Sequence, residues 1–209
     1  MRRALLVCGV VSSIVYLAAD VFGALRWEGY SYVDQTISEL AAADAPSRPV
    51  VMPLFLAYDA LLFAFSAGVA RSPVRATRVT AAMLAAVALI GVAAYFFPIH
   101  TRGAAWSINE TMHSILTAVT VIFIVLSMGF GASAAGPRFR RYSIATLVVT
   151  LLAGAWGGWI GRSLADNGPT PWVGIVERVS VFSYLLWVAV LAIALLPRRR
   201  QPDVLRAAA

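Results

Sequence analysis

The chain has 209 residues, of which 60% are hydrophobic and 13% are charged, and its mean hydropathy of +0.79 excludes an ordinary soluble domain. Its net charge of +7 comes from arginines in short clusters beside apolar runs. This arrangement excludes a nucleic-acid partner, which needs one basic face, and favours contact with anionic lipid headgroups.

Apolar stretches of about 20 residues recur along the chain, which is the length that a helix needs to cross roughly 30 Å of hydrocarbon. Each is predicted to be a helix, because hydrocarbon offers the backbone no hydrogen-bond partner. The first stretch is too long for a signal peptide and is expected to be retained. The predicted spans are residues 4–26, 50–70, 79–97, 107–130, 142–163 and 174–196. The sequence thus predicts an all-α, six-helix transmembrane domain over residues 1–197 and a basic tail at 198–209.

Arginine clusters fall on alternate connections between these spans, and the side that holds them is predicted to be cytoplasmic. They are Arg2, Arg3, Arg71, Arg75, Arg78, Arg138, Arg140, Arg141, Arg198, Arg199 and Arg200. With six spans, both termini are then cytoplasmic. All seventeen basic residues are arginine and alanine is abundant, which is typical of GC-rich bacterial genomes. We therefore expect a multi-pass protein of the bacterial inner membrane.

The longest external loop is predicted at residues 27–49. Within it, Thr36 and Glu39 have the spacing of a capping box, which predicts a short interfacial helix. Glu39 can serve as a cap, as a member of a functional site, or as both. Asp34 and Ser38 lie beside it and are candidate substrate-binding residues.

Two helices carry polar stripes that enter the membrane from the external side. Glu110, His113, Thr117 and Thr120 share one face of the fourth span. On the sixth span, the stripe is Glu177, Ser180 and Tyr184, with Arg178 next to it. Such stripes avoid lipid, so the two are expected to share a polar pocket. Arg178 can instead extend to the interface or pair with a neighbouring acid.

Two further acids lie deeper in the predicted spans, and both are candidate substrate-binding residues. Asp59 falls near the middle of the second span, and Asp20 lies about two turns inside the first. A carboxylate in hydrocarbon is unfavourable, so each either pairs with an arginine such as Arg102 or Arg162 or holds a proton. A protonated acid suits proton-relay or general-acid chemistry, and a hydrogen-bonded structural acid fits the same sequence.

The only two histidines, His100 and His113, are expected near the external surface. With Glu39, Glu110 or Glu177 they could form a two-histidine carboxylate metal site, although no fixed ligand spacing such as HExxH is present. An acid/base role of His113, paired with Glu110 or Glu39, is favoured over a metal site, and no cofactor is predicted. The sequence also lacks nucleotide, flavin and haem motifs.

The fifth span contains two overlapping small-residue pairs, which flatten one helix face for close packing. The pairs are Gly154 with Gly158 and Gly157 with Gly161. Packing inside the bundle is the favoured interpretation, and self-association through this face is the alternative.

The polar segments of the chain resemble the bacterial membrane-protein family catalogued as domain of unknown function 998. The residues that carry the resemblance are Tyr30-Ser31 through Asp34, Thr36-Ile37-Ser38-Glu39-Leu40, Phe97-Pro98, His113 and Gly174-Ile175-Val176-Glu177-Arg178. The resemblance covers most of the chain and implies six helices, but it implies no activity. Its polar motif matches Asp34, Ser38, Glu39, His113, Glu177 and Arg178, and His100 and Glu110 match it less well.

The leading hypothesis is an enzyme that performs acid/base chemistry on a lipid or prenyl substrate, for example a membrane-embedded terpene cyclase. Its predicted catalytic residues are Glu39, Glu110, His113 and Glu177. Asp34, Ser38, Arg178, Trp106, Tyr184, Asp20 and Asp59 are predicted to bind substrate. Aromatic residues that could shelter a carbocation are Trp106, Trp156, Trp159, Phe182 and Tyr184. The alternatives are a metal-dependent lipid hydrolase and a noncatalytic lipid- or ion-binding, transport or envelope accessory protein.

Overall fold

The computed structural model describes residues 1–196, which form helices, turns and loops without strands. The long helices are α1 (Arg2–Arg26), α2 (Arg48–Ala70), α3 (Arg75–Ala94), α4 (Ile108–Gly131), α5 (Pro137–Gly161) and α6 (Val173–Leu195). Two short 3-10 helices, η1 (Ser38–Ala41) and η2 (Arg162–Asp166), lie in the connections. All six long helices are apolar and long enough to cross a membrane. The predicted basic tail at 198–209 lies outside the described residues.

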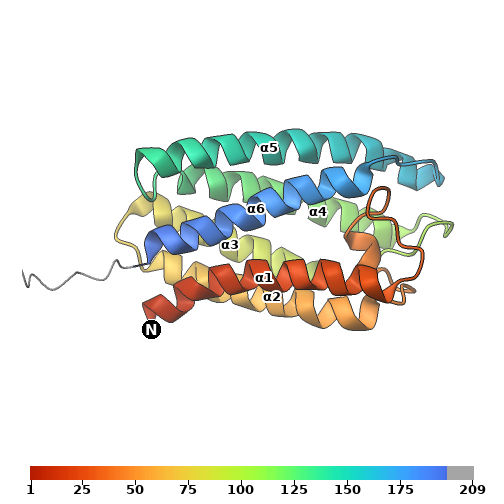
Figure 1. The fold of residues 1–209 in the computed structure, drawn as a ribbon, viewed down its shortest axis with the longest axis horizontal. Coiled ribbons are helices and arrows are strands. Elements are labelled where there is room, and N and C mark those ends of the chain that lie inside the picture. The colour runs from red at the N-terminus through yellow and green to blue at the C-terminus, as the bar shows by residue number, and fades with distance from the viewer. Residues whose placement is uncertain (197–209) are drawn as a thin grey trace, which may run out of the picture.

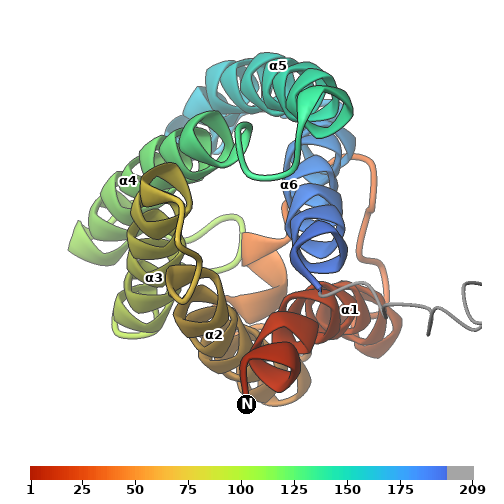
Figure 2. The same ribbon diagram turned by 90° about the vertical axis from the view of Figure 1, so that its left-hand side faces the viewer.

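The six helices stand side by side in a ring that follows chain order, and α6 packs back against α1 (Figures 1 and 2). We call the end of the bundle where the chain begins and α6 finishes the terminal end. The opposite end is the loop end, and it carries the connections at 27–47, 95–107 and 162–172. Most of the polar residues predicted to be functional lie at or near the loop end, whereas Asp59 and Tyr184 lie near the middle of their helices.

Most helix boundaries lie within two residues of the predicted ones, and three differ by more. The start of α3 lies at Arg75, four residues before the predicted position, and the other two differ for identifiable reasons. α3 ends at Ala94, three residues early, because Tyr95 to Phe97 form a turn that leads into Pro98. α5 begins at Pro137, five residues early, because proline suits the first turn of a helix. The arginine-rich segment that follows Pro137 is therefore the first turn of α5 rather than a loop.

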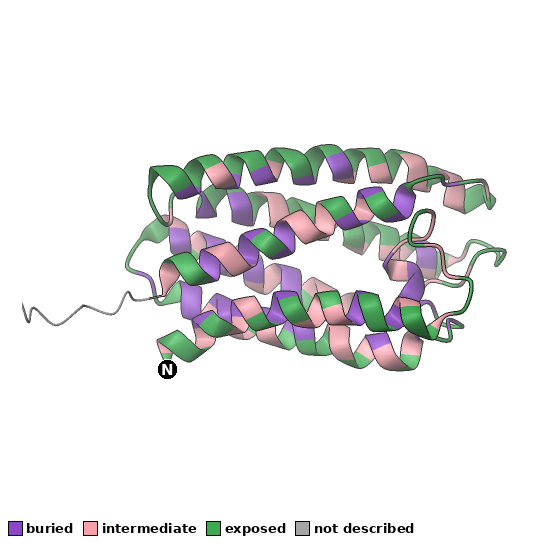
Figure 3. Cartoon of the chain, viewed as in Figure 1, coloured by how far each residue is buried: buried purple, intermediate pink, exposed green. Residues whose placement is uncertain are grey.

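The terminal half of the bundle is filled by apolar side chains. Trp187 is fully buried, and its indole nitrogen donates a hydrogen bond to the Ser143 hydroxyl at 2.9 Å. The buried residues of Figure 3 lie on the faces that the helices turn toward one another. Other fully buried residues in this half are Leu6, Phe65, Leu84, Met128 and Leu191. The terminal half is thus packed with apolar side chains, and the cavity described below lies nearer the loop end.

α5 is the most exposed helix of the ring, and its glycines divide into two pairs. A Cβ atom at Gly154 or Gly157 would contact side chains of α6, so these two positions face the bundle. A Cβ atom at Gly158 or Gly161 would have no neighbour within 4 Å. One member of each predicted small-residue pair thus packs inside the bundle, and the other faces outward.

Candidate functional site

The loop at 27–47 folds back over the loop end of the bundle, and η1 lies inside the ring of helices (Figure 2). Ile37, Glu39 and Leu40 are at least 97% buried. Ser47 holds the end of the loop by donating to the backbone oxygen of Leu40 at 2.7 Å. The loop therefore forms a plug over the interior, where the sequence predicts only a short interfacial helix.

Glu39 stabilises this plug. Its carboxylate accepts hydrogen bonds from the amide and hydroxyl of Thr36 at 2.7 and 3.0 Å, and its own amide donates to the Thr36 hydroxyl, which is the reciprocal pattern of a capping box. It also pairs with Arg102, whose Nε lies 2.6 Å from Oε1. This hydrogen bond raises the pKa of Arg102. Arg102, considered from the sequence as a partner for a deeper acid, thus pairs with Glu39 because both lie in loop segments.

The buried partner of Asp20 is Arg178, not Arg102 or Arg162. Arg178 is 94% buried, and its Nη2 lies 2.8 Å from Oδ1 of Asp20. The same guanidinium group donates to the Tyr30 hydroxyl at 2.7 Å and lies 4.0 Å from the centre of the Tyr32 ring. The Tyr32 hydroxyl donates to Asp20 at 3.0 Å, and burial followed by the Asp20 charge raises the pKa of Tyr32 to about 12. This cluster locks the plug against α1 and α6.

Two other predicted acids also hold backbone segments in place. Asp34 accepts a hydrogen bond from the amide of Trp172 at 3.0 Å, and Trp172 has a φ of 68°, a left-handed conformation that is rare for a bulky residue. Glu110 closes a capping box with Ser107 at the start of α4. Glu110 also accepts from the amide and ring of His100, at 2.9 and 2.8 Å.

The two histidines are therefore in different surroundings. His100 is bound to Glu110 at the loop end, whereas His113 points into the interior. Within residues 1–196, no three His, Cys, Asp or Glu side chains are grouped so that they could hold a metal ion.

A central cavity of about 260 Å³ extends from the loop end past the middle of the bundle. All six long helices and η1 contribute to its wall, and the plug closes it at the loop end. Its apolar lining includes Ile37, Phe55, Val87, Leu116, Val121, Ile124 and Val181. Its polar lining includes Ser38, Arg48, Asp59, His113, Thr117, Thr120, Thr150, Glu177, Ser180 and the tyrosines 16, 58, 95 and 184. The polar stripes of α4 and α6 thus border one shared space, apart from Glu110.

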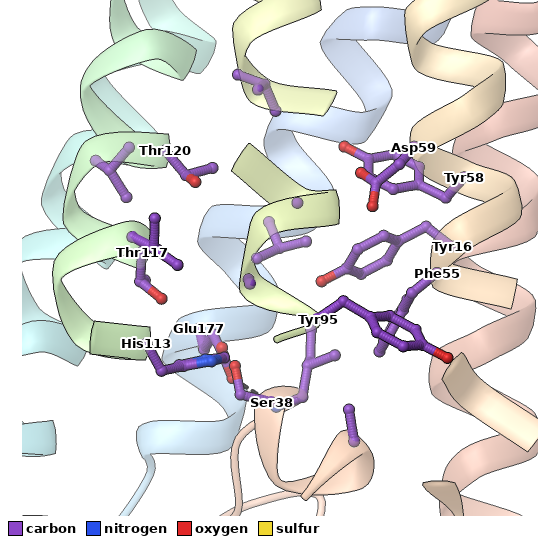
Figure 4. Close-up of a pocket in the computed structure, with 18 of the residues that line it drawn as sticks. Tyr16, Ser38, Phe55, Tyr58, Asp59, Tyr95, His113, Thr117, Thr120 and Glu177 are labelled. Carbon is purple, nitrogen blue, oxygen red and sulfur yellow. Dashed lines mark hydrogen bonds between the residues drawn. The ribbon is translucent and has the colours of Figure 1, made fainter. Parts of the chain in front are cut away.

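His113, Glu177 and Ser38 lie together at the loop end of the cavity (Figure 4). One carboxylate oxygen of Glu177 accepts the Ile37 amide at 2.6 Å, which orients the acid from the plug. The Nδ1 atom of His113 is buried and has no hydrogen-bond partner in the described part of the chain. An imidazole nitrogen without a partner, beside a carboxyl group, can accept a proton from a bound molecule or donate one to it.

Asp59 lies deeper in the cavity, with Tyr58 and Tyr16 around it (Figure 4). It is only 6% exposed, and no residue between 1 and 196 forms a hydrogen bond with its carboxyl group. Gly91 makes room for it, because a Cβ atom at this position would lie 2.3 Å from Oδ1 of Asp59. The Tyr16 ring packs between Phe55 and Tyr58, with centroids 5.0 and 4.9 Å away.

The predicted site residues therefore divide into two groups. Ser38, Asp59, His113, Glu177 and Tyr184 line the cavity. Asp20, Asp34, Glu39, Glu110 and Arg178 lie outside it and form the contacts of the loop end described above. Trp106 is also outside the cavity, is 45% exposed, and donates to the Thr111 hydroxyl at 3.0 Å.

The aromatic lining differs from the set expected from the sequence. Trp156 and Trp159 are 58% and 67% exposed on α5, and of the expected aromatic residues only Tyr184 lines the cavity in the described structure. Tyr16, Phe55, Tyr58 and Tyr95 line it instead. The sequence did contain a signal for Tyr16 and Tyr58. Tyrosines normally gather at membrane interfaces, and these two lie well inside predicted spans, which indicates that they face the interior of the bundle.

The model of a known protein family matches residues 10–194, which include every residue that lines the cavity. The family is described as "Protein of unknown function (DUF998)". This chain belongs to the DUF998 family. The match confirms the resemblance noted from the sequence, and the DUF998 description carries no activity. No curated protein and no solved structure is significantly similar to the chain.

Proposed function

We propose that this DUF998 protein is a membrane enzyme that performs acid/base chemistry on a lipid or prenyl substrate in the central cavity. The observation that carries the proposal is the arrangement of His113 and Glu177, which face one apolar cavity from different helices. Apolar pockets with a few convergent polar groups are the usual form of small-molecule sites. A titratable pair at membrane depth, with hydrogen-bonding capacity left unused, supports this proposal of chemistry in the cavity.

In this proposal, cyclisation of a prenyl chain illustrates the chemistry. Glu177 donates a proton to an alkene carbon or an epoxide oxygen of the substrate, and a carbocation forms. A carbon–carbon double bond of the same chain attacks the cation and closes a ring. His113 then accepts a proton from the carbon next to the new cation, which restores a double bond. Tyr16, Phe55 and Tyr184 supply aromatic faces that stabilise positive charge.

Glu39 and Glu110 have positioning roles in this proposal. Glu39 holds the plug that orients Glu177 through the Ile37 amide, and Glu110 fixes the start of the helix that carries His113. Both were predicted to be catalytic from the sequence, but neither lines the cavity.

A noncatalytic lipid-binding role is the second candidate, because the same apolar cavity suits a bound acyl or prenyl chain. A transport role has less support, since fully buried apolar residues such as Trp187 and Leu191 fill the terminal end beyond the cavity. A metal-dependent hydrolase also has less support, because His100 and His113 contact different surroundings.

Membrane placement is part of the proposal. We place the protein in the bacterial inner membrane with both termini in the cytoplasm, because the topology brings Arg2, Arg71, Arg75 and Arg138 to the terminal end. Reporter fusions at each terminus test this orientation, and a periplasmic signal from either terminus would contradict it. Self-association through the outward-facing Gly158 and Gly161 is a further prediction, which cross-linking of a Gly158→Cys variant tests.

The enzyme proposal is tested by incubating the purified protein with the lipid extract and with prenyl alcohols and epoxides, followed by mass spectrometry. A substrate should disappear and an isomer or proton-transfer product should form. The Glu177→Gln and His113→Ala variants should fold and lack this turnover. A stoichiometric bound lipid that no form of the protein converts would favour the noncatalytic role instead.

A further inference from the structure

Deeper than the His113 and Glu177 pair, the cavity contains a ring of oxygen-bearing side chains at one depth. Asp59 lies eleven residues after the start of α2, Tyr184 eleven after the start of α6, and Thr150 eleven before the end of α5. At about 1.5 Å per residue, each is about 16 Å from the loop end of its helix. Tyr16 on α1 and Thr120 on α4 lie within one residue of this depth. We call these five residues, which all line the cavity, the polar belt.

The hydrogen-bonding groups of the polar belt are largely unsatisfied. Tyr184, Thr150 and Asp59 are only 2, 3 and 6% exposed. The hydroxyl oxygens of Tyr184 and Thr150 are buried and lack any partner within residues 1–196. The Thr146 hydroxyl, by contrast, bonds to a backbone oxygen of its own helix at 2.9 Å. Buried polar groups are normally paired, so this set is suited to bind the polar group of a ligand.

The chemistry of the polar belt restricts that ligand group. Carboxylate and hydroxyl oxygens accept hydrogen bonds, and an ammonium group offers three donors and no acceptor. The belt adds the faces of Tyr16 and Tyr184, which attract a cation. In the described structure, Arg48 is the only arginine that lines the cavity. It lies at the loop end, eleven residues along α2 from Asp59. An anionic group is therefore disfavoured at the belt.

The size and walls of the cavity restrict the rest of the ligand. A bare metal ion would leave most of the roughly 260 Å³ empty, and apolar residues such as Val87, Ile124 and Val181 offer it no ligands. A plain hydrocarbon would leave the Asp59 carboxyl group and two buried hydroxyls unpaired. A molecule with both a cationic nitrogen and a hydrocarbon part satisfies the two conditions.

We infer that the polar belt binds the ammonium group of a lipophilic amine, with its nitrogen at Asp59 and its hydrocarbon part against the apolar wall. The inference rests on the proposed function and narrows its substrate class to an amine-bearing lipid. Glu177 lies two turns from Tyr184 along α6, so the acid/base pair is about 10 Å from the belt. The amine anchors the substrate at one end while the pair acts on a bond nearer the loop end.

The test measures binding and needs no turnover. Hexylamine and hexan-1-ol are titrated into the full-length protein in uncharged maltoside micelles at pH 7, with isothermal titration calorimetry as the readout. Hexylamine is protonated under these conditions, since an alkyl ammonium has a pKa of about 10.4. The wild-type protein should bind hexylamine at least tenfold more tightly than hexan-1-ol.

Matched variants separate the belt from general charge effects. Asp59→Asn should weaken hexylamine binding at least tenfold and leave hexan-1-ol binding unchanged. Glu28→Gln removes one exposed negative charge and should change neither affinity. If Asp59→Asn does not fold, Tyr184→Phe keeps the ring, removes the hydroxyl, and should weaken hexylamine binding several-fold.

Equal affinities for the amine and the alcohol, or unchanged amine affinity in folded Asp59→Asn and Tyr184→Phe, would overturn the inference. If Glu177→Gln loses turnover but still binds hexylamine, the inference is supported. If no form of the protein shows turnover but hexylamine binding still depends on Asp59, only the proposed function is overturned.

Discussion

Arg178 and Asp20 form a buried, two-point ion pair, with Nη2 2.8 Å from Oδ1 and Nε 3.3 Å from Oδ2. Arg178 also donates to the backbone oxygens of Tyr32, Gln35 and Gly174. One guanidinium group therefore joins α1, α6 and the plug. Since the plug orients Glu177, this pair supports the cavity without lining it.

Replacing Arg178 by glutamine should destabilise the protein by about 3–5 kcal/mol, because Asp20 is left as a buried charge without its partner. The measurement is the free energy of unfolding in mixed micelles. The Asp20→Asn and Arg178→Gln double variant serves as the control. Its loss should be clearly smaller than the sum of the single losses, and strictly additive losses would show that the two side chains act independently.

Gly174 is a second point of close approach between α6 and the plug. A Cβ atom there would lie 2.3 and 2.5 Å from the backbone oxygens of Gln35 and Tyr32. Gly174→Ala should therefore lower stability by about 1–3 kcal/mol, since backbone must move to admit the methyl group. Gly129→Ala is the matched control, because that position is open and alanine favours a helix. A Gly174→Ala variant as stable as Gly129→Ala would contradict this contact.

Gly91→Ala offers a way to displace Asp59 without changing its chemistry. The added methyl group would push against the Asp59 carboxyl group, which can rotate away. The free energy of unfolding should therefore change by no more than about 1–2 kcal/mol. Hexylamine binding should nevertheless weaken several-fold in the titration described above. Gly129→Ala, with no atom within 4 Å of the new Cβ, should preserve binding. Equal hexylamine affinity in Gly91→Ala and Gly129→Ala would contradict the assignment of Asp59 to the amine site.

A pH-dependent contact links the connections at 27–47 and 95–107. Thr101 donates its hydroxyl and its amide to Asp44, the amide at 2.9 Å, and these bonds hold the pKa of Asp44 below its ordinary value of 3.8. Because the folded value is the lower one, the contact stabilises the fold above pH 3.8 and is lost as the pH falls through the folded pKa. A carbon-13 NMR titration should give an Asp44 midpoint below 3.8. A midpoint at or above that value would contradict the contact.

The helices were accessible to sequence analysis because hydrocarbon allows few alternatives for the backbone. Hydropathy located all six, and the spacing of His113 with Thr117 and of Glu177 with Tyr184 placed each pair on one helix face. The partner of Asp20 was not predictable, since Arg178 reaches it across 158 positions of sequence. Which arginine meets which acid depends on how the helices assemble, and hydropathy carries no such information.

The sequence also did not show which of the predicted acids stabilise the plug and which line the cavity. Glu39 and Glu177 are both acids at the loop end, yet one stabilises the plug and the other lines the cavity. The capping-box spacing of Thr36 and Glu39 did indicate a structural role, and the structure contains that hydrogen-bond pattern. The folding of the plug into the bundle had no comparable signal, because it depends on long-range contacts such as that of Ile37 with Glu177.

The most direct test of the central claim compares turnover and stability in four variants once a substrate has been found. Glu177→Gln and His113→Ala should lower kcat by a factor on the order of 10²–10⁴, the usual contribution of general acid/base groups, with little change in unfolding temperature. Glu39→Gln and Glu110→Gln should instead lower the unfolding temperature, because they lose capping and ion-pair contacts. Folded Glu177→Gln and His113→Ala proteins with wild-type kcat would contradict the account.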